Sequence, residues 1–218
     1  IANGQTSEKF QVKVGTAQGC PLSPALFNVF IQDLLDDLNK SGKGVITLAY
    51  ADDIVVVADS AERLQQLITI CAIWTGENKM KAKVIKSAVL ELPADKKKPL
   101  KNTIYTYNKV PLPKVDTYKY LGVLYDDDVS FKKQVEKRKA ASRRKIGFFK
   151  KFMKLPGMPI HIKRKMVEAS ILAADRYGVE CWGWDHDDDL DAITNHCCRA
   201  ILQLPAKGEN TASGAGVR

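Results

Sequence analysis

Residues 45–58 read VITLAYADDIVVVA, and the organisation of the chain's first half follows from them. A run of apolar and β-branched residues leads to Tyr50, the adjacent carboxylates Asp52 and Asp53 follow, and a second β-branched run leads away. Two such runs on either side of a short polar step predict a β-hairpin with acidic residues at its tip. A two-residue turn here contains neither Gly nor Asn, so we expect it to be under some strain.

The acidic pair at the tip is a candidate metal site. Two carboxylates held side by side repel each other, and a divalent cation bound between Asp52 and Asp53 would remove that repulsion. Mg²⁺ suits such a site because it takes hard oxygen ligands and keeps open positions when it also binds phosphates. The alternative is an ordinary hairpin closed by an Asp-Asp turn, since Asp is a common turn residue.

Three further motifs accompany the hairpin in order along the chain. They are GTAQGCPLSP at 15–24, Lys86-Ser87, and Tyr120-Leu121-Gly122. Together with YADD at 50–53 they resemble the reverse transcriptases. Among these they are most similar to the enzymes of non-LTR (LINE-type) retrotransposons, which share the QGCPLSP sequence. The resemblance covers nearly the whole chain, and four motifs in order are much more specific than one.

The resemblance implies an α+β fold with two main parts. Residues 1–125 would form part of a polymerase palm, which is an antiparallel sheet with packed helices. Residues 126–207 would form an α-helical thumb with further C-terminal helices. The small and polar composition of residues 208–218 separately predicts a flexible tail. Apolar residues at helical spacing agree with helices over about 23–38, about 59–78 and from about 130 onward.

Local patterns predict the helix starts. Ser23 would cap the first helix, and Asp59 with Glu62 resembles a capping pair for the second.

The same kind of pattern predicts strands and a buried helix face. Strands are expected over 88–92 and 118–125, with a hairpin around Asn108-Lys109. The second helix of the C-terminal part would bury Ile162, Met166, Ile171 and Ala174.

Catalytic roles follow from the resemblance. Asp52 and Asp53 would be catalytic residues and ligands of Mg²⁺ (or Mn²⁺), with Asp52 the principal ligand. Lys86 would protonate the departing pyrophosphate or stabilise its charge. A solvated lysine among neighbouring lysines is the alternative for Lys86.

Substrate and template contacts would come from Gln18, Gly19 and Tyr50. The Gly-rich turn leads into a helix, whose first backbone N–H groups can bind an anion; a plain strand-turn-helix is the alternative.

Primer binding is assigned to another motif. Tyr120, Leu121 and Gly122 would hold the primer's 3′ end, where a Gly allows close backbone approach. An aromatic strand that merely packs is the alternative.

The charge of the chain is concentrated in one segment. The net charge is +9, yet residues 132–165 contain fourteen Lys and Arg and a single acidic residue, Glu136. Such a segment predicts sequence-independent, salt-sensitive contact with a nucleic-acid backbone, although a basic face also suits a solvated helix. The residues expected to make these contacts are Lys137, Arg138, Arg143, Arg144 and Lys145.

The implied reaction is transfer of a nucleotide from a dNTP to the 3′-OH of a DNA primer on an RNA or DNA template, with two metal ions. In the family, the partner Asp and the fingers precede the QG motif, so we expect this chain alone to be inactive. The missing N-terminal palm and fingers would come from the same longer chain or from a partner. The alternatives are a catalytically dead, reverse-transcriptase-derived nucleic-acid-binding protein and a basic structural domain with an accidental YADD.

The cysteines and the hydropathy of the chain indicate the cellular compartment that we expect for it. The five cysteines form no CxxC pair, which predicts a reducing, intracellular compartment, nucleus or cytoplasm. No apolar run reaches the ~18 residues of a membrane span, so no membrane partner is expected. Cys181, His186 and the His196-Cys197-Cys198 run lack the spacing of a zinc finger or knuckle. The chain begins at Ile1, so we expect it to be a piece of a longer one.

Overall fold

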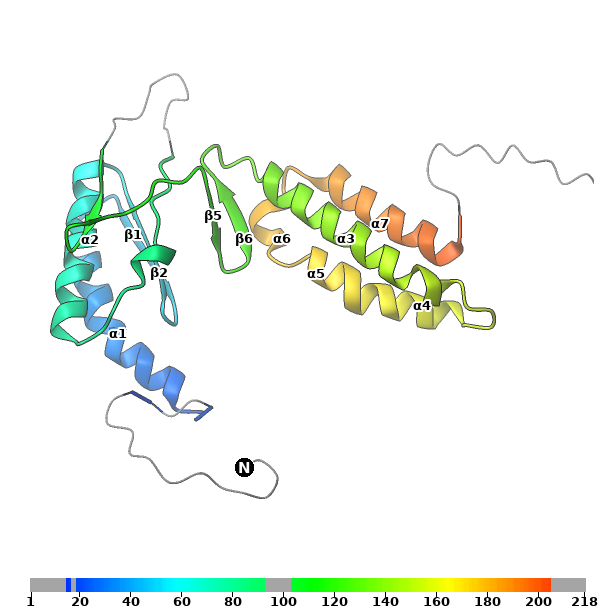
Figure 1. The fold of residues 1–218 in the computed structure, drawn as a ribbon, viewed down its shortest axis with the longest axis horizontal. Coiled ribbons are helices and arrows are strands. Elements are labelled where there is room, and N and C mark those ends of the chain that lie inside the picture. Colours follow the sequence, from blue (N-terminus) through cyan, green and yellow to red (C-terminus); the bar gives the residue numbers. More distant parts are fainter. Residues whose placement is uncertain (1–14, 17–18, 93–102, 205–218) are drawn as a thin grey trace, which may run out of the picture. The chain divides into compact units, whose positions relative to one another are not determined.

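The computed structural model of the chain describes residues 15–16, 19–92 and 103–204. These residues form two compact units (Figure 1). The first contains the described residues up to Val89 together with 103–113, and the second contains 90–92 and 114–204. The predicted division at residue 125 rests on motifs, and the assignment of its parts to palm and thumb stays a prediction. The expected tail, 208–218, lies outside the described residues.

The described part of the first unit combines helices with two short hairpins. Its elements are α1 (Ser23–Asn39), β1 (Val45–Tyr50), β2 (Asp53–Ala58), α2 (Ala61–Glu77), the 3₁₀-helix η1 (Val84–Lys86), β3 (Thr106–Tyr107) and β4 (Val110–Pro111). β1 pairs with β2 and β3 pairs with β4, both antiparallel. The predicted hairpins over 45–58 and around Asn108-Lys109 are therefore confirmed.

Helices α1 and α2 pack against one face of the β1–β2 hairpin (Figure 1). The shared core contains Ile31, Leu34, Leu38, Leu67 and Trp74 from the helices and Val45, Ile54, Val56 and Ala58 from the hairpin. Side chains alternate along a strand, so Ile46 and Leu48 point to the opposite face, where they are 57% and 53% exposed. Burial of one face specifies the register that leaves Asp52 in the turn.

Both helix starts differ from the predictions. α1 begins at Ser23, so Leu22 and not Ser23 occupies the N-cap position. α2 is capped by Ser60, whose Oγ accepts a hydrogen bond from the N–H of Arg63 at 3.3 Å. The predicted cap Asp59 forms an ion pair with the Arg63 guanidinium instead. Ser60 is the cap because it directly precedes the first helical residue with an extended backbone, the position from which a side-chain oxygen accepts from the N–H groups of the first turn.

The described part of the second unit is one hairpin followed by packed helices. Its elements are β5 (Thr117–Tyr120), β6 (Val123–Asp126), α3 (Lys132–Met153), α4 (Ile160–Val167), the π-helix η2 (Glu168–Leu172), α5 (Ala173–Asp175), α6 (Val179–Trp182) and α7 (Asp187–Leu202). Ile146, Met153, Val167, Ile171, Ile193 and Cys197 form its larger core cluster. A second cluster joins β6 to α3 and α6 through Val123, Val135 and Trp182.

Two predicted strands are wrong. Residues 88–92 form no strand, and Val89 makes only an isolated bridge, with its N–H donating to Pro113 O at 2.9 Å. Residues 118–125 are not one strand, because the chain reverses at Leu121 and Gly122 and pairs Tyr120 with Val123. The aromatic pattern on both sides of the turn is typical of a strand, and the turn itself carries only one glycine as its signal.

The inward face of the α4–η2–α5 segment also differs from the prediction. Ile162 is 38% exposed, and the buried positions are Lys163, Val167, Ile171 and Asp175, at intervals of four. Lys163 and Val167 share a face of α4, as residues four apart do in any α-helix, and the same interval continues across the π-helix η2 to Ile171 and Asp175. The prediction is therefore confirmed at Ile171 and wrong at Ile162, while Met166 and Ala174 are half-buried.

Helices with small antiparallel sheets make this an α+β protein, as predicted at that level. Each sheet of the described ranges has two strands. Within those ranges, no helix is both long and apolar enough to cross a membrane.

Candidate functional site

The acidic pair lies at the tip of the β1–β2 hairpin. Tyr50 pairs with Asp53, which leaves Ala51 and Asp52 as a two-residue turn, and Ala51 has a φ of +52°. A non-glycine residue in this region is strained by about 1–2 kcal/mol, so the predicted strain is confirmed. Both Asp52 and Asp53 are exposed, and Tyr50 is 67% exposed.

The geometry of the tip partly meets the needs of Mg²⁺. Cross-strand partners share a face, so Tyr50 and Asp53 lie on the side of the hairpin opposite α1 and α2. Asp52 and Asp53 supply two hard oxygen donors at a solvent-accessible position, where a bound ion would keep water ligands. Among the described residues, no group of three or more His, Cys, Asp or Glu side chains could hold a metal ion. The pair therefore fits a partial magnesium site.

Two other predicted positions of the first unit are also exposed. Gly19 has a φ of +85° and precedes α1, while Gln18 lies outside the described residues. Lys86 is the last residue of η1 and its side chain is exposed. Their roles toward substrate stay predictions.

The Tyr120-Leu121-Gly122 motif belongs to the second unit and forms the β5–β6 turn. Leu121 and Gly122 have φ values of +44° and +86°. Two consecutive positive φ values are the signature of a type I′ hairpin turn. The motif therefore presents a tight turn and not the straight strand edge that the sequence predicts.

The five basic residues predicted to bind a nucleic-acid backbone all lie on α3, but they divide into two groups. Lys137, Arg143 and Arg144 are exposed. Arg138 and Lys145 are partly buried and donate to backbone carbonyls of the same unit, Arg138 to Ala174 O at 3.0 Å and Lys145 to Ser170 O at 2.8 Å. The described structure thus leaves three of the five side chains facing solvent.

The positive charges around α3 affect the pKa of one of its lysines. Partial burial, together with the charges of Lys119 and Arg138, lowers the pKa of Lys137. A bound polyanion would relieve this repulsion, because an opposite charge favours the protonated amine.

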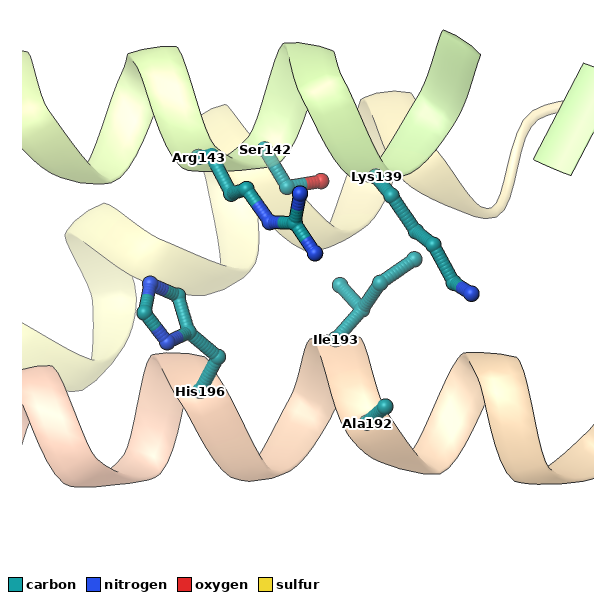
Figure 2. Close-up of a pocket in the computed structure, with 6 residues that line it drawn as sticks. All are labelled: Lys139, Ser142, Arg143, Ala192, Ile193 and His196. Carbon is teal, nitrogen blue, oxygen red and sulfur yellow. The ribbon is translucent and has the colours of Figure 1, made fainter. Parts of the chain in front are cut away.

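A cavity of about 170 Å³ between α3 and α7 is a feature that sequence reasoning missed. Lys139, Ser142, Arg143, Ala192, Ile193 and His196 line it (Figure 2). Figure 2 shows Arg143 and His196 reaching into the space from the two facing helices. The sequence offered no signal for it, because the two helices are far apart in the chain. His196 therefore lies beside basic side chains and not in a zinc-binding group of the described residues.

One interaction network fixes α3 against α7 next to this cavity. Lys139 forms ion pairs with Glu136 at 3.3 Å and with Asp189, and His186 Nδ1 lies 3.2 Å from Asp189 Oδ2. The hydrogen bond from Lys139 is the main cause of a lowered pKa at Asp189 and, reciprocally, of a raised pKa at Lys139.

Comparison with known proteins agrees with the motifs. Residues 1–125, which contain all four motifs, match the family model described as reverse transcriptase (RNA-dependent DNA polymerase). A retrovirus-related Pol polyprotein from type-1 retrotransposable element R2 of Popillia japonica is 30% identical over 139 residues, which are 57% of this chain and 23% of that protein. A probable RNA-directed DNA polymerase from transposon X-element of Drosophila melanogaster is 26% identical over 208 residues, 89% of this chain and 22% of that protein.

A second R2 Pol polyprotein, from Nasonia vitripennis, is 30% identical over 125 residues, 51% of this chain and 12% of that protein. The chain therefore spans less than a quarter of the length of each of these relatives. Because the family model covers more than half of the chain and these relatives are retrotransposon enzymes, this chain belongs to the reverse transcriptase family, in its non-LTR retrotransposon branch.

Proposed function

We propose that this chain is the palm, from the QG motif onward, and the thumb of an RNA-directed DNA polymerase that extends a DNA primer on an RNA or DNA template. The observation that carries the proposal is the YADD hairpin, whose two exposed carboxylates stand at a strained tip within a family-matched segment. A hairpin under strain persists when the surrounding packing holds it, and here one face of the hairpin packs against α1 and α2.

Each motif contributes position or charge, as in phosphoryl transfer generally. Asp52 and Asp53 would hold Mg²⁺ or Mn²⁺ through their carboxylate oxygens, with Asp52 the principal ligand. The bound ions would activate the primer 3′-OH and neutralise the triphosphate. Lys86 would place a positive charge at the departing pyrophosphate.

The remaining contacts would align the substrates. Gln18, Gly19 and Tyr50 would contact the dNTP and the template base, and the turn at Leu121-Gly122 would hold the primer end. The exposed Lys137, Arg143 and Arg144 of α3 would contact the nucleic-acid backbone.

We further propose that the 218-residue chain alone does not polymerise. Two carboxylates are fewer ligands than a two-ion site requires, and further carboxylate ligands would come from a longer polypeptide or a partner. Nuclear or cytoplasmic location and the absence of a membrane partner remain part of this proposal.

Primer extension by a longer polypeptide that contains this chain tests the function. We expect Asp52→Asn to lower kcat at least about 100-fold, because a metal-held charge contributes several kcal/mol in the transition state. Asp53→Asn should be less severe, and Asp33→Asn, an exposed carboxylate of α1, is the matched control. Extension by the double Asn variant at the wild-type rate would refute the catalytic proposal.

A second candidate function is nucleic-acid binding without catalysis, favoured by the exposed basic side chains of α3. The two proposals differ in metal dependence. A polymerase requires Mg²⁺ or Mn²⁺ for product formation, whereas a binding protein should retain duplex affinity with EDTA and yield no product with either metal.

A further inference from the structure

The β5–β6 turn has a backbone conformation that a leucine at position 121 does not favour. Leu121 has a φ of +44°, in the left-handed region that a bulky L-residue rarely adopts. Residues in this region persist where surrounding contacts hold them. The contacts that hold this turn come from α3 and from the segment after α5.

Tyr177 contacts both central residues of the turn. Its hydroxyl donates a hydrogen bond to Leu121 O at 2.8 Å. Its ring lies against Gly122, where a Cβ atom would be only 2.9 Å from Tyr177 Cε1. Gly122 is therefore needed for the aromatic ring as well as for its φ of +86°.

Arg138 joins the same residues from α3. Its Nη1 donates to Ala174 O at 3.0 Å and its Nη2 donates to Gly122 O at 3.4 Å. The guanidinium carbon lies 5.6 Å from the centroid of the Tyr177 ring, in cation–π range. One planar, forked side chain thus connects the turn, the end of the α4–η2–α5 segment and the aromatic ring.

We infer that Arg138 and Tyr177 are positioning residues that set the backbone of the β5–β6 turn, and we name this pair the turn clamp. It deepens the proposed function, because that function places the primer's 3′ end at this turn. The turn clamp fixes the carbonyls of Leu121 and Gly122, and through them the surface offered to the primer. Arg138 thereby acts through protein backbone and not through a phosphate of the nucleic acid.

Two conservative variants test the turn clamp in the full chain. Tyr177→Phe removes one hydroxyl and keeps the ring; Arg138→Lys keeps the charge and removes the fork. The readout is amide hydrogen exchange at residues 121–123, which needs no substrate. We expect about fivefold faster exchange in each variant, the effect of removing one hydrogen bond of ordinary net strength.

Matched controls remove the same groups elsewhere in the chain. Tyr107→Phe removes a hydroxyl that is hydrogen-bonded to Thr75 in the first unit, and Arg164→Lys alters an exposed arginine paired with Glu168. Both should leave exchange at 121–123 unchanged. Unchanged exchange in Tyr177→Phe and Arg138→Lys would overturn the turn clamp.

A second measurement separates this inference from the proposed function. A primer–template duplex with 4-thiothymidine at the primer 3′ end is cross-linked to the chain, and the yield at residues 120–122 is mapped by mass spectrometry. The turn clamp predicts a drop of about fivefold in that yield in both variants, matching the removal of one hydrogen bond. Total duplex affinity should stay within about twofold, because Arg138→Lys preserves the charge.

The outcomes are distinguishable. If the wild-type chain gives no cross-link at 120–122, the proposed contact of the turn with the primer is wrong. The turn clamp is then still tested by hydrogen exchange, which needs no primer. If the wild type cross-links there and both variants do so equally, the positioning role fails and the proposed function stands. Direct phosphate contact by Arg138 would instead show in Arg138→Gln, which removes the charge, as a smaller slope of log K against log salt concentration.

Discussion

At the scale of single residues, Gly122 is required both by the local backbone and by a tertiary contact. Its positive φ and the nearby Tyr177 ring both exclude a side chain. We predict that Gly122→Ala lowers the free energy of unfolding of the second unit by about 1–2 kcal/mol, through left-handed strain and displacement of the ring. Urea unfolding followed by the fluorescence of Trp182 and Trp184 measures this.

Gly147 provides the opposite control in the same unit. It lies within α3, and a Cβ atom there would meet nothing within 4 Å. Gly147→Ala should therefore raise the free energy of unfolding by about 0.5–1 kcal/mol, because Ala favours the helix. An equal change in the free energy of unfolding in Gly122→Ala and Gly147→Ala would show that the β5–β6 turn does not require a glycine at position 122.

At the scale of elements, the ion pair of Lys139 with Asp189 connects α3 to α7. The pKa of Asp189 is lowered in the folded chain, so its stabilising contribution is present above the unfolded value of about 4 and is lost as pH falls further. The pKa of Lys139 is raised, so its contribution is present below about pH 10 and is lost at higher pH.

We therefore predict that Asp189→Asn lowers the free energy of unfolding by about 0.5–1 kcal/mol between pH 5 and 9, and has a smaller effect near pH 3. Urea unfolding at several pH values measures the difference between variant and wild type. Asp188→Asn, at an exposed neighbour on α7, is the control. A difference that does not change with pH would show that the ion pair is not the cause.

At the scale of the whole molecule, the charge distribution predicts salt-dependent binding to nucleic acid. Replacement of the exposed Lys137, Arg143 and Arg144 by Gln should reduce the slope of log K against log salt concentration by about 0.9 for each phosphate of duplex DNA that the variant no longer neutralises. Fluorescence anisotropy with a labelled duplex gives that slope.

A control triple variant separates local charge from net charge. Lys40, Lys79 and Lys81 are exposed lysines of the first unit, and their replacement by Gln changes the net charge equally. The control should leave most of the slope intact. Equal reduction of the slope in both triple variants would mean that α3 is not the binding element.

The family, the acidic hairpin, the long basic helix and the α+β class could all be read from the sequence, because each depends on residues that are neighbours in the chain. The alternation over 45–58 specifies a hairpin locally, and the register places Asp52 in its turn. The cap at Ser60 and the reversal at Leu121-Gly122 were missed because competing local signals stood beside them.

Tertiary contacts determined which side chains of the C-terminal helices face the core and which face solvent. Ile162 faces outward because α4 turns Lys163 and Val167 toward the core of the second unit, and Arg138 points inward because the carbonyls of Ala174 and Gly122 lie within its reach. These partners are distant in sequence, so no spacing along the chain encodes which of several arginines will meet them. The direction of a long, charged side chain is set by the packing around it, and that packing exists only in the folded protein.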